Sequence, residues 1–164
     1  TQAKVRDTRK TTPGLRALEK YAVRCGGGVN HRMSLSDAAL VKDNHIVAAG
    51  GVAQAFAAVR SAAPNIVLEI EVDSVDQLRT ALTAGADLVL LDNMSPDVLR
   101  EAVAVAQNHV ERTGHPVILE ASGGLTLDNA QSVAATGVDY ISVGALTHSA
   151  KVLDIGLDLE TIVG

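Results

Sequence analysis

The sequence predicts a parallel α/β fold of six or seven strands, an incomplete TIM-like barrel. Short apolar runs alternate with longer helix-forming segments, as in repeated strand–helix–strand units. Charged or small polar residues follow nearly every apolar run, which is typical of a barrel whose site is built from the carboxyl ends of all its strands. The chain has 164 residues, whereas a complete eight-stranded barrel needs about 250. A doubly wound open sheet is the competing architecture, and it would concentrate the site at one switch point.

The expected strands and helices alternate along the chain. Runs of Val, Leu, Ile and Ala predict strands at residues 4–8, 39–42, 66–72, 88–92, 117–121 and 140–143, with a weaker one near 152–157. Apolar residues at helical spacing predict helices over residues 13–24, 52–62, 75–84, 96–112 and 127–135. In the first helix, Thr12 is the expected N-cap, Pro13 the first helical residue and Gly26 the C′ residue. No low-complexity linker interrupts this order, so we expect one domain.

The segment IVLEIEVD, residues 66–73, indicates which strand face points inward. Glu69, Glu71 and Asp73 share one face, because side chains alternate along a strand. The intervening Ile70 and Val72 form the apolar face that outer helices would cover, so the carboxylates are expected to point into the barrel. The same reasoning places three further charged residues inward: Lys42, Asp92 and Glu120.

Carboxylates inside a barrel need positive partners, because an unpaired charge is costly in a low-dielectric interior. The candidate partners are Arg9, Lys10, Arg32 and Lys42. An internal ion-pair network that only stabilises the fold is one interpretation. The convergence of both charge signs at one end of a barrel favours the other, a site for a polar ligand. Arg9 and Lys10 would point to opposite sides if the first strand reaches them.

Composition excludes several classes of protein. The net charge is −5, basic residues form no long run, and aromatic residues make up only 2%, which argues against a nucleic-acid binder. The lone Cys25 cannot form an internal disulfide and suits a reducing cytoplasm. No apolar run is long enough to span a bilayer, and no signal peptide is visible. We therefore expect a cytoplasmic protein without a membrane or nucleic-acid partner.

Three glycine-rich segments carry candidate binding groups. GGGVNHR, residues 26–32, is either a flexible loop after a helix or a close approach to a ligand that delivers His31 and Arg32. SGGLT at 122–126 and SVGALTHS at 142–149 place small residues between a strand and a helix, where backbone N–H groups bind phosphate. Tight turns chosen for geometry are the alternative, but barrels often bind phosphate after their last strands.

Glu71 and Asp92, on neighbouring strands, are candidate Mg²⁺ ligands. This ion prefers oxygen donors and usually takes one or two carboxylates together with substrate phosphates and water. No cluster of His and Cys in the sequence indicates zinc.

Several long segments resemble the quinolinate phosphoribosyltransferase family. They are DTRKTTPGLRALEKYAVRCGGGVNHRMSLSDAALVKDNH, EIEVDS, LLDN, SGGL and GVDYISVGALTHS, in the same order almost from end to end. Arg6 stands where the family usually has an apolar residue, a departure outside the functional positions. The resemblance implies a seven-stranded, open TIM-like α/β barrel. It also implies a homodimer that joins quinolinate to 5-phosphoribosyl-1-pyrophosphate. The implied products are nicotinate mononucleotide, pyrophosphate and CO₂, in de novo NAD synthesis.

The resemblance also implies roles for individual residues. The quinolinate carboxylates would be held by Arg9, His31, Arg32 and Lys42. The phosphoribosyl pyrophosphate would be surrounded by Lys10, Glu71, Asp92, Ser122, Gly123, Gly124, Gly144 and His148. Of these, Lys10, Glu71 and Asp92 would be catalytic, and Glu71 and Asp92 would bind Mg²⁺.

The family carries a further domain ahead of the barrel, which supplies an arginine to the neighbouring subunit's site. Residues 1–164 are therefore expected to be the catalytic barrel domain alone, with weak or absent turnover. The alternatives are a related phosphoribosyltransferase that takes nicotinate without decarboxylation, the family's molybdenum-associated relative, and a non-catalytic barrel fragment. A sugar-phosphate aldolase or isomerase with Lys42 as a Schiff-base lysine is a more distant alternative.

Overall fold

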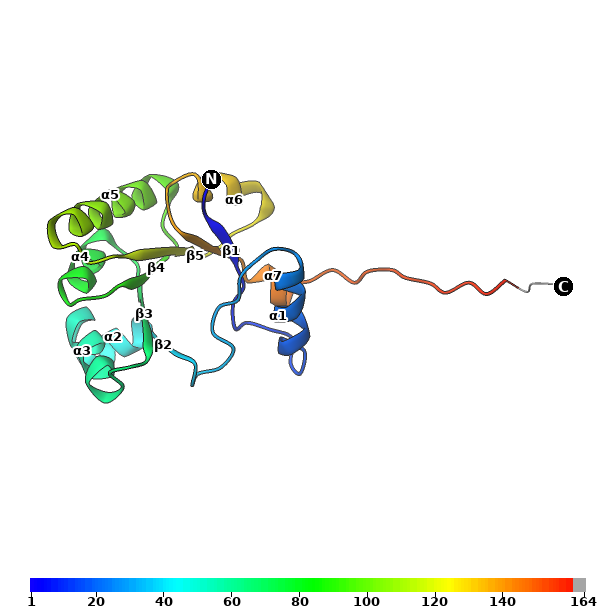
Figure 1. The fold of residues 1–164 in the computed structure, drawn as a ribbon, viewed down its shortest axis with the longest axis horizontal. Helices are drawn as coiled ribbons and strands as arrows, with labels where there is room; N and C mark the ends of the chain where they lie inside the picture. The colour runs from blue at the N-terminus through cyan, green and yellow to red at the C-terminus, as the bar shows by residue number, and fades with distance from the viewer. Residues whose placement is uncertain (161–164) are drawn as a thin grey trace.

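The computed structural model describes residues 1–160, which form one parallel sheet of six strands with helices around it (Figure 1). The strands are β1 Lys4–Arg6, β2 Ala38–Val41, β3 Val67–Val72, β4 Leu88–Asp92, β5 Ile118–Ser122 and β6 Tyr140–Ser142. The helices are α1 Arg16–Cys25, α2 Asp43–Ala49, α3 Val52–Ala62, α4 Val75–Thr83, α5 Pro96–Thr113, α6 Leu127–Ala134 and α7 Ala145–His148. The strand order is β1-β6-β5-β4-β3-β2, so β1 and β2 are the two edges.

This topology is an open α/β barrel, as expected, with six strands rather than seven. All neighbouring strands are parallel, and β1 pairs with β6, the last of these strands along the chain. In the described part of the chain no ladder joins β1 to β2, so the barrel stays open there. The six main predicted strands are confirmed within a few residues.

The seventh predicted strand, near residues 152–157, is wrong. This segment is extended and exposed, and it leads away from the sheet without pairing to it (Figure 1). Its alternating apolar residues resemble a strand, but neither sheet edge lies beside it. Pattern alone cannot supply the neighbouring strand that a β-ladder needs.

The five predicted helices are confirmed, with one displaced start. Helix α1 begins at Arg16 instead of residue 13, because Gly14 adopts a left-handed φ of 79° that a continuous helix cannot contain. At its other end, Gly27 rather than Gly26 takes the left-handed conformation. The short helices α2 and α7 were not expected from the sequence.

The core lies between the sheet and helices α3, α4 and α5, which cover its outer face (Figure 1). From β3, Ile70 and Val72 enter this core, and Leu78 of α4 and Leu91 of β4 pack there fully buried. Glu69, between the core-facing residues, is on the inner side, where it meets His31. The alternation argument for this strand is therefore confirmed. None of the helices described here has both the length and the apolar character needed to cross a bilayer.

Candidate active site

A polar cavity of about 210 Å³ opens at the carboxyl ends of the strands. Six residues predicted from the sequence line it: Arg9, Lys10, His31, Arg32, Lys42 and Glu71. Thr8, Leu40, Leu90, Glu120 and Ser142 complete its wall. These side chains come from five strands or the residues just after them and from two loops, so the cavity depends on the sheet to bring distant segments together.

Arg9 and Lys10 line the same cavity, and the condition for them to point to opposite sides, a first strand that reaches them, is not met. Strand β1 ends at Arg6, so strand alternation does not extend to residues 9 and 10. The segment is held instead by hydrogen bonds to its backbone. Arg16 Nη2 donates to Arg9 O at 3.3 Å, and Thr147 Oγ1 donates to Lys10 O at 2.7 Å. Arg9 additionally borders a neighbouring, mostly apolar cavity beside β2.

The inner carboxylates are neutralised partly by residues that sequence reasoning did not assign. Lys42 Nζ pairs with Glu71, as expected. Glu69 and Glu120, however, have Arg6 as their cationic partner rather than Arg9, Lys10 or Arg32, and His31 contacts them as a hydrogen-bond partner. His31 Nε2 is 2.8 Å from Glu69 Oε2, and Arg6 Nη1 pairs with Glu120 and lies 4.0 Å from Glu69 Oε1.

Arg6 is therefore a half-buried cation that contacts a residue of the cavity wall, Glu120, and not a residue remote from the functional positions. Its register partner on β6 is Ser142, whose hydroxyl donates to the same Glu120 carboxylate. The Arg6 guanidinium also lies 4.7 Å from the centre of the Tyr140 ring. A charged residue at a usually apolar strand position, with inward carboxylates nearby, was the signal in the sequence that pointed to it.

Burial shifts the pKa of one carboxylate and one guanidinium that line the cavity. Loss of solvation raises the pKa of Glu120, and repulsion by Glu69 adds to the rise, while Arg6 and His31 oppose it. Burial also lowers the pKa of Arg32, and the positive charge of Arg9 lowers it further. Arg32 nevertheless remains a cation at neutral pH, because a guanidinium does not lose its proton in proteins.

His31 is held in one tautomer. Its Nδ1 accepts a hydrogen bond from the Arg32 backbone N–H at 2.8 Å, so the ring proton lies on Nε2, facing Glu69. Donor atoms of His31, Glu69 and Glu120 lie within 4.8 Å of one another, a spacing that suits a metal ion. Arg6 already supplies positive charge to these carboxylates and would repel a cation there, so the triad is an ion-pair network and not a metal site.

The expected Mg²⁺ ligands lie on adjacent strands, at the mouth of the barrel. Glu71 contacts Lys42, and Asp92 Oδ2 accepts from Asn93 Nδ2 at 2.7 Å. Neither carboxylate belongs to a group of three ligand side chains in the described residues. Two carboxylates without a third protein ligand fit Mg²⁺, which takes its remaining oxygens from phosphates and water.

The two small-residue segments follow the ends of β5 and β6, and of their residues only Ser142 lines the 210 Å³ cavity. Ser122 is in register with Asp92, and Gly123 and Gly124 follow with left-handed φ values of 104° and 58°. A Cβ atom on Gly144 would lie 3.0 Å from His148 Nε2, so these two residues are neighbours. Asp92, Ser122, Gly123, Gly124, Gly144 and His148 are not among the residues that line this cavity.

Gly123 is the glycine that the local geometry requires. A Cβ atom there would lie 2.8 Å from the Asn93 backbone nitrogen, on a residue with a left-handed φ. We expect Gly123→Ala to lower the free energy of unfolding by about 1–3 kcal/mol and to move the β5 loop away from Asn93. Gly124→Ala is the matched control, because it has a left-handed φ but no atom within 4 Å. Equal losses for both variants in urea unfolding would contradict the steric argument.

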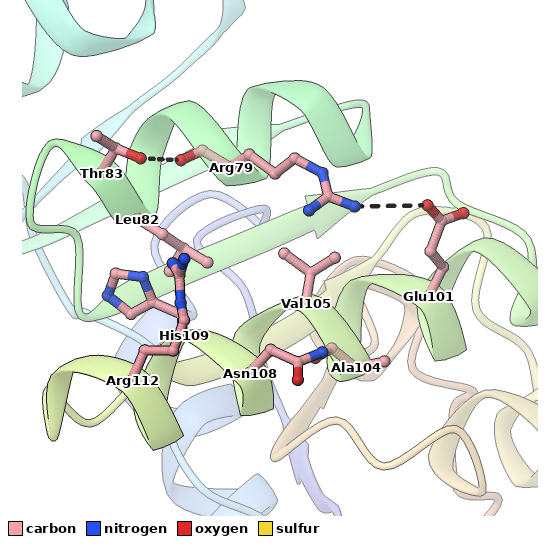
Figure 2. A pocket seen from close by; sticks show the side chains of 9 residues that line it. All are labelled: Arg79, Leu82, Thr83, Glu101, Ala104, Val105, Asn108, His109 and Arg112. Carbon is pink, nitrogen blue, oxygen red and sulfur yellow. Dashed lines mark hydrogen bonds and ion pairs between the residues drawn. The ribbon is translucent and has the colours of Figure 1, made fainter.

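A second cavity, of about 630 Å³, lies on the outer side of the molecule between α4 and α5 (Figure 2). Figure 2 shows Arg79 reaching toward Glu101 across this groove, at an N–O distance of 4.0 Å. It contains none of the residues predicted for the site. The chemistry is therefore expected at the strand ends.

Comparisons with known proteins agree with this arrangement. The family model described as "Quinolinate phosphoribosyl transferase, C-terminal domain" matches residues 1–158. The chain is 58% identical, over 159 residues, to the nicotinate-nucleotide pyrophosphorylase (carboxylating) of Mycobacterium leprae, covering 97% of this chain and 55% of that protein. It is 46% identical to the human protein of the same name, covering 94% of this chain and 51% of that protein.

Solved structures show the same similarity. The nicotinate-nucleotide pyrophosphorylase of Ehrlichia chaffeensis superposes with a TM-score of 0.89 and 42% identity, covering 98% of this chain and 56% of that chain. The enzyme of the same name from Francisella tularensis gives a TM-score of 0.84 and 47% identity, covering 92% and 51%. The chain thus spans about half the length of the relatives it matches.

Proposed function

Because the chain belongs to the quinolinate phosphoribosyltransferase family, we propose that it carries the phosphoribosyl transfer and decarboxylation site of such an enzyme. The reaction joins quinolinate to 5-phosphoribosyl-1-pyrophosphate and yields nicotinate mononucleotide, pyrophosphate and CO₂. The observation that carries the proposal is the meeting of Arg9, Lys10, Arg32 and Lys42 in one small cavity. Such a density of cations suits substrates that are themselves anions.

In this proposal, quinolinate binds through its two carboxylates. Arg9 and Arg32 lie on the cavity wall, and a guanidinium fork matches a carboxylate in a bidentate manner. Lys42 adds a point charge from the end of β2. His31 has both ring nitrogens engaged within the protein, so its share of quinolinate binding requires the ring or the ligand to displace one of these contacts.

The phosphoribosyl pyrophosphate would lie toward the rim. Lys10 faces the cavity, while Ser122, Gly123, Gly124, Gly144 and His148 offer backbone N–H groups and a ring nitrogen to phosphate oxygens. Glu71 and Asp92 would hold Mg²⁺, which supplies positive charge against the pyrophosphate when bound.

The reaction follows from this placement. The bond between ribose and pyrophosphate breaks with both electrons leaving on pyrophosphate, and the sugar develops oxocarbenium character. Lys10 offsets the charge on the departing group, and nearby carboxylates offset the charge on the sugar. The pyridine nitrogen then forms the new bond to ribose, which mainly needs alignment. The resulting pyridinium accepts the electron pair when the adjacent carboxylate leaves as CO₂, and that carbon takes up a proton.

We also propose a homodimer located in the cytoplasm. The family resemblance supports the dimer, and the lone exposed Cys25 suits a reducing compartment. The open edge between β1 and β2, with an apolar cavity beside β2, is where a neighbouring subunit would complete the site.

Calorimetric titration of the 164-residue chain with quinolinate and with nicotinate tests the proposal. We expect quinolinate to bind at least about tenfold more tightly, because nicotinate lacks one charge-assisted contact. Equal affinities would favour a transferase for nicotinate, and no heat with either would favour a non-catalytic domain. Borohydride trapping of Lys42 with a carbonyl substrate would instead indicate an aldolase.

Turnover is the second arm of the test. Formation of nicotinate mononucleotide and CO₂ is measured for this chain and for a full-length relative. We expect weak or absent product from the 164 residues alone, because they span about half of such a protein. Robust product from this chain would contradict that expectation.

A further inference from the structure

A buried ion pair lies behind the loop that carries His31 and Arg32. Asp7 is fully buried and Lys20 is 1% exposed, and Lys20 Nζ is 2.5 Å from Asp7 Oδ1. Neither residue lines the cavity. Asp7 directly follows β1, and Lys20 lies in the middle of α1. The pair therefore connects the segment that leads to Arg9 and Lys10 with the helix that precedes the His31 loop.

This pair holds the backbone of His31 from both sides. The His31 N–H donates to Asp7 Oδ1 at 2.7 Å, and Lys20 Nζ donates to His31 O at 3.0 Å. Asn30 supports the arrangement by donating to Asp7 Oδ2 at 2.5 Å and to Lys20 O at 2.8 Å. Both polar groups of one peptide residue are thus fixed by opposite charges of a single ion pair.

The effect continues to the next residue. The Arg32 N–H donates to His31 Nδ1, and Arg32 Nη1 donates to Ala38 O at 2.7 Å. The backbone of Arg32, from which its side chain extends, is therefore tied to the position of His31. By contrast, the segment with Arg9 and Lys10 has its own anchors, Arg16 and Thr147.

A stability role alone does not account for this pair. Replacing a buried ion pair by apolar residues of similar volume is often neutral or stabilising. Here the charged groups of Asp7 and Lys20 also make hydrogen bonds to residues 30 and 31, and these bonds fix the orientation of that segment. We propose that Asp7 and Lys20 are positioning residues that set His31 and Arg32 for the aromatic dicarboxylate. The proposal rests on the proposed function of the cavity.

The test uses the double variant Asp7→Asn/Lys20→Met, which removes both charges and leaves no lone buried charge. Amide hydrogen exchange is measured at residues 30–32, with calorimetric affinities for quinolinate and inorganic pyrophosphate. We expect exchange at His31 to accelerate at least about tenfold and quinolinate affinity to fall about tenfold, the effect of one misaligned charge-assisted hydrogen bond. Pyrophosphate affinity should change less than about threefold, because Lys10 has separate anchors.

The matched control is Asp97→Asn/Arg100→Met, which removes an exposed ion pair of the same 2.5 Å spacing. It should change neither exchange at residues 30–32 nor either affinity. Unchanged exchange at His31 in the Asp7/Lys20 variant, or equal losses for quinolinate and pyrophosphate, would overturn the positioning role. If the unaltered chain binds no quinolinate, the proposed function fails separately, and the exchange measurement alone decides whether the pair holds His31.

Discussion

Replacing Arg6 by methionine is expected to lower the free energy of unfolding by about 3–5 kcal/mol at neutral pH, because it leaves the Glu69 and Glu120 carboxylates without their shared cation. Methionine keeps most of the side-chain volume, so the loss reports charge rather than a cavity. Urea unfolding at pH 7 measures it. Arg100→Met, which removes an exposed partner of Asp97, is the control and should change stability by less than about 1 kcal/mol.

The effect of Arg6→Met should depend on pH. Burial raises the pKa of Glu120 in the folded protein, so its contribution to stability is fully present below its ordinary pKa and is lost as pH rises through the raised value. Removing Arg6 raises that pKa further. The variant should therefore approach the unaltered protein in stability as the pH falls toward 5. The double variant Arg6→Met/Glu120→Gln should recover most of the loss at pH 7, and failure to recover would contradict the charge argument.

Arg32→Ala is expected to weaken quinolinate binding about a hundredfold or more, the loss of a bidentate contact between a guanidinium and a carboxylate. Calorimetry on the folded variant measures the affinity, and thermal unfolding checks that the loss of the Arg32 contact to Ala38 O has not unfolded the loop.

Arg32→Lys is the conservative comparison. It keeps the charge but not the fork, so its affinity should lie between those of the unaltered chain and Arg32→Ala. Unchanged quinolinate affinity in the alanine variant would remove Arg32 from the site and weaken the whole carboxylate-clamp interpretation.

The strands and most helices could be predicted because their signals are local. Strand β3 alternates Glu69, Ile70, Glu71 and Val72, and each residue faces the side that its polarity indicates. The start of α1 was misplaced because a proline and a threonine signal a helix start, whereas the backbone of Gly14 decides it. Residues 152–157 were misassigned because a strand also needs a partner, which the local pattern does not contain.

The charged residues of the candidate site could be predicted from the sequence, but which of them form ion pairs with one another could not. Lys42 was expected among the cations that partner the inward carboxylates, and it does pair with Glu71. The partners of Glu69 and Glu120 depend on β1 lying beside β6, a contact between residues separated by more than a hundred positions. The burial of Lys20 could not be predicted either, because a lysine in an amphipathic helix usually faces water.

The extended segment after α7 has a consequence for the behaviour of the chain in solution. Leu153, Ile155, Leu157 and Leu159 fall at every second residue and are all exposed, with Leu157 at 85%. Their backbone N–H and C=O groups pair with no strand of the described residues. An extended segment that is apolar on one side and has unpaired backbone groups can pair with a free strand edge. In other copies of the chain, β1 and β2 are such edges. At high concentration we therefore expect copies of the chain to aggregate through this segment, in competition with ligand binding.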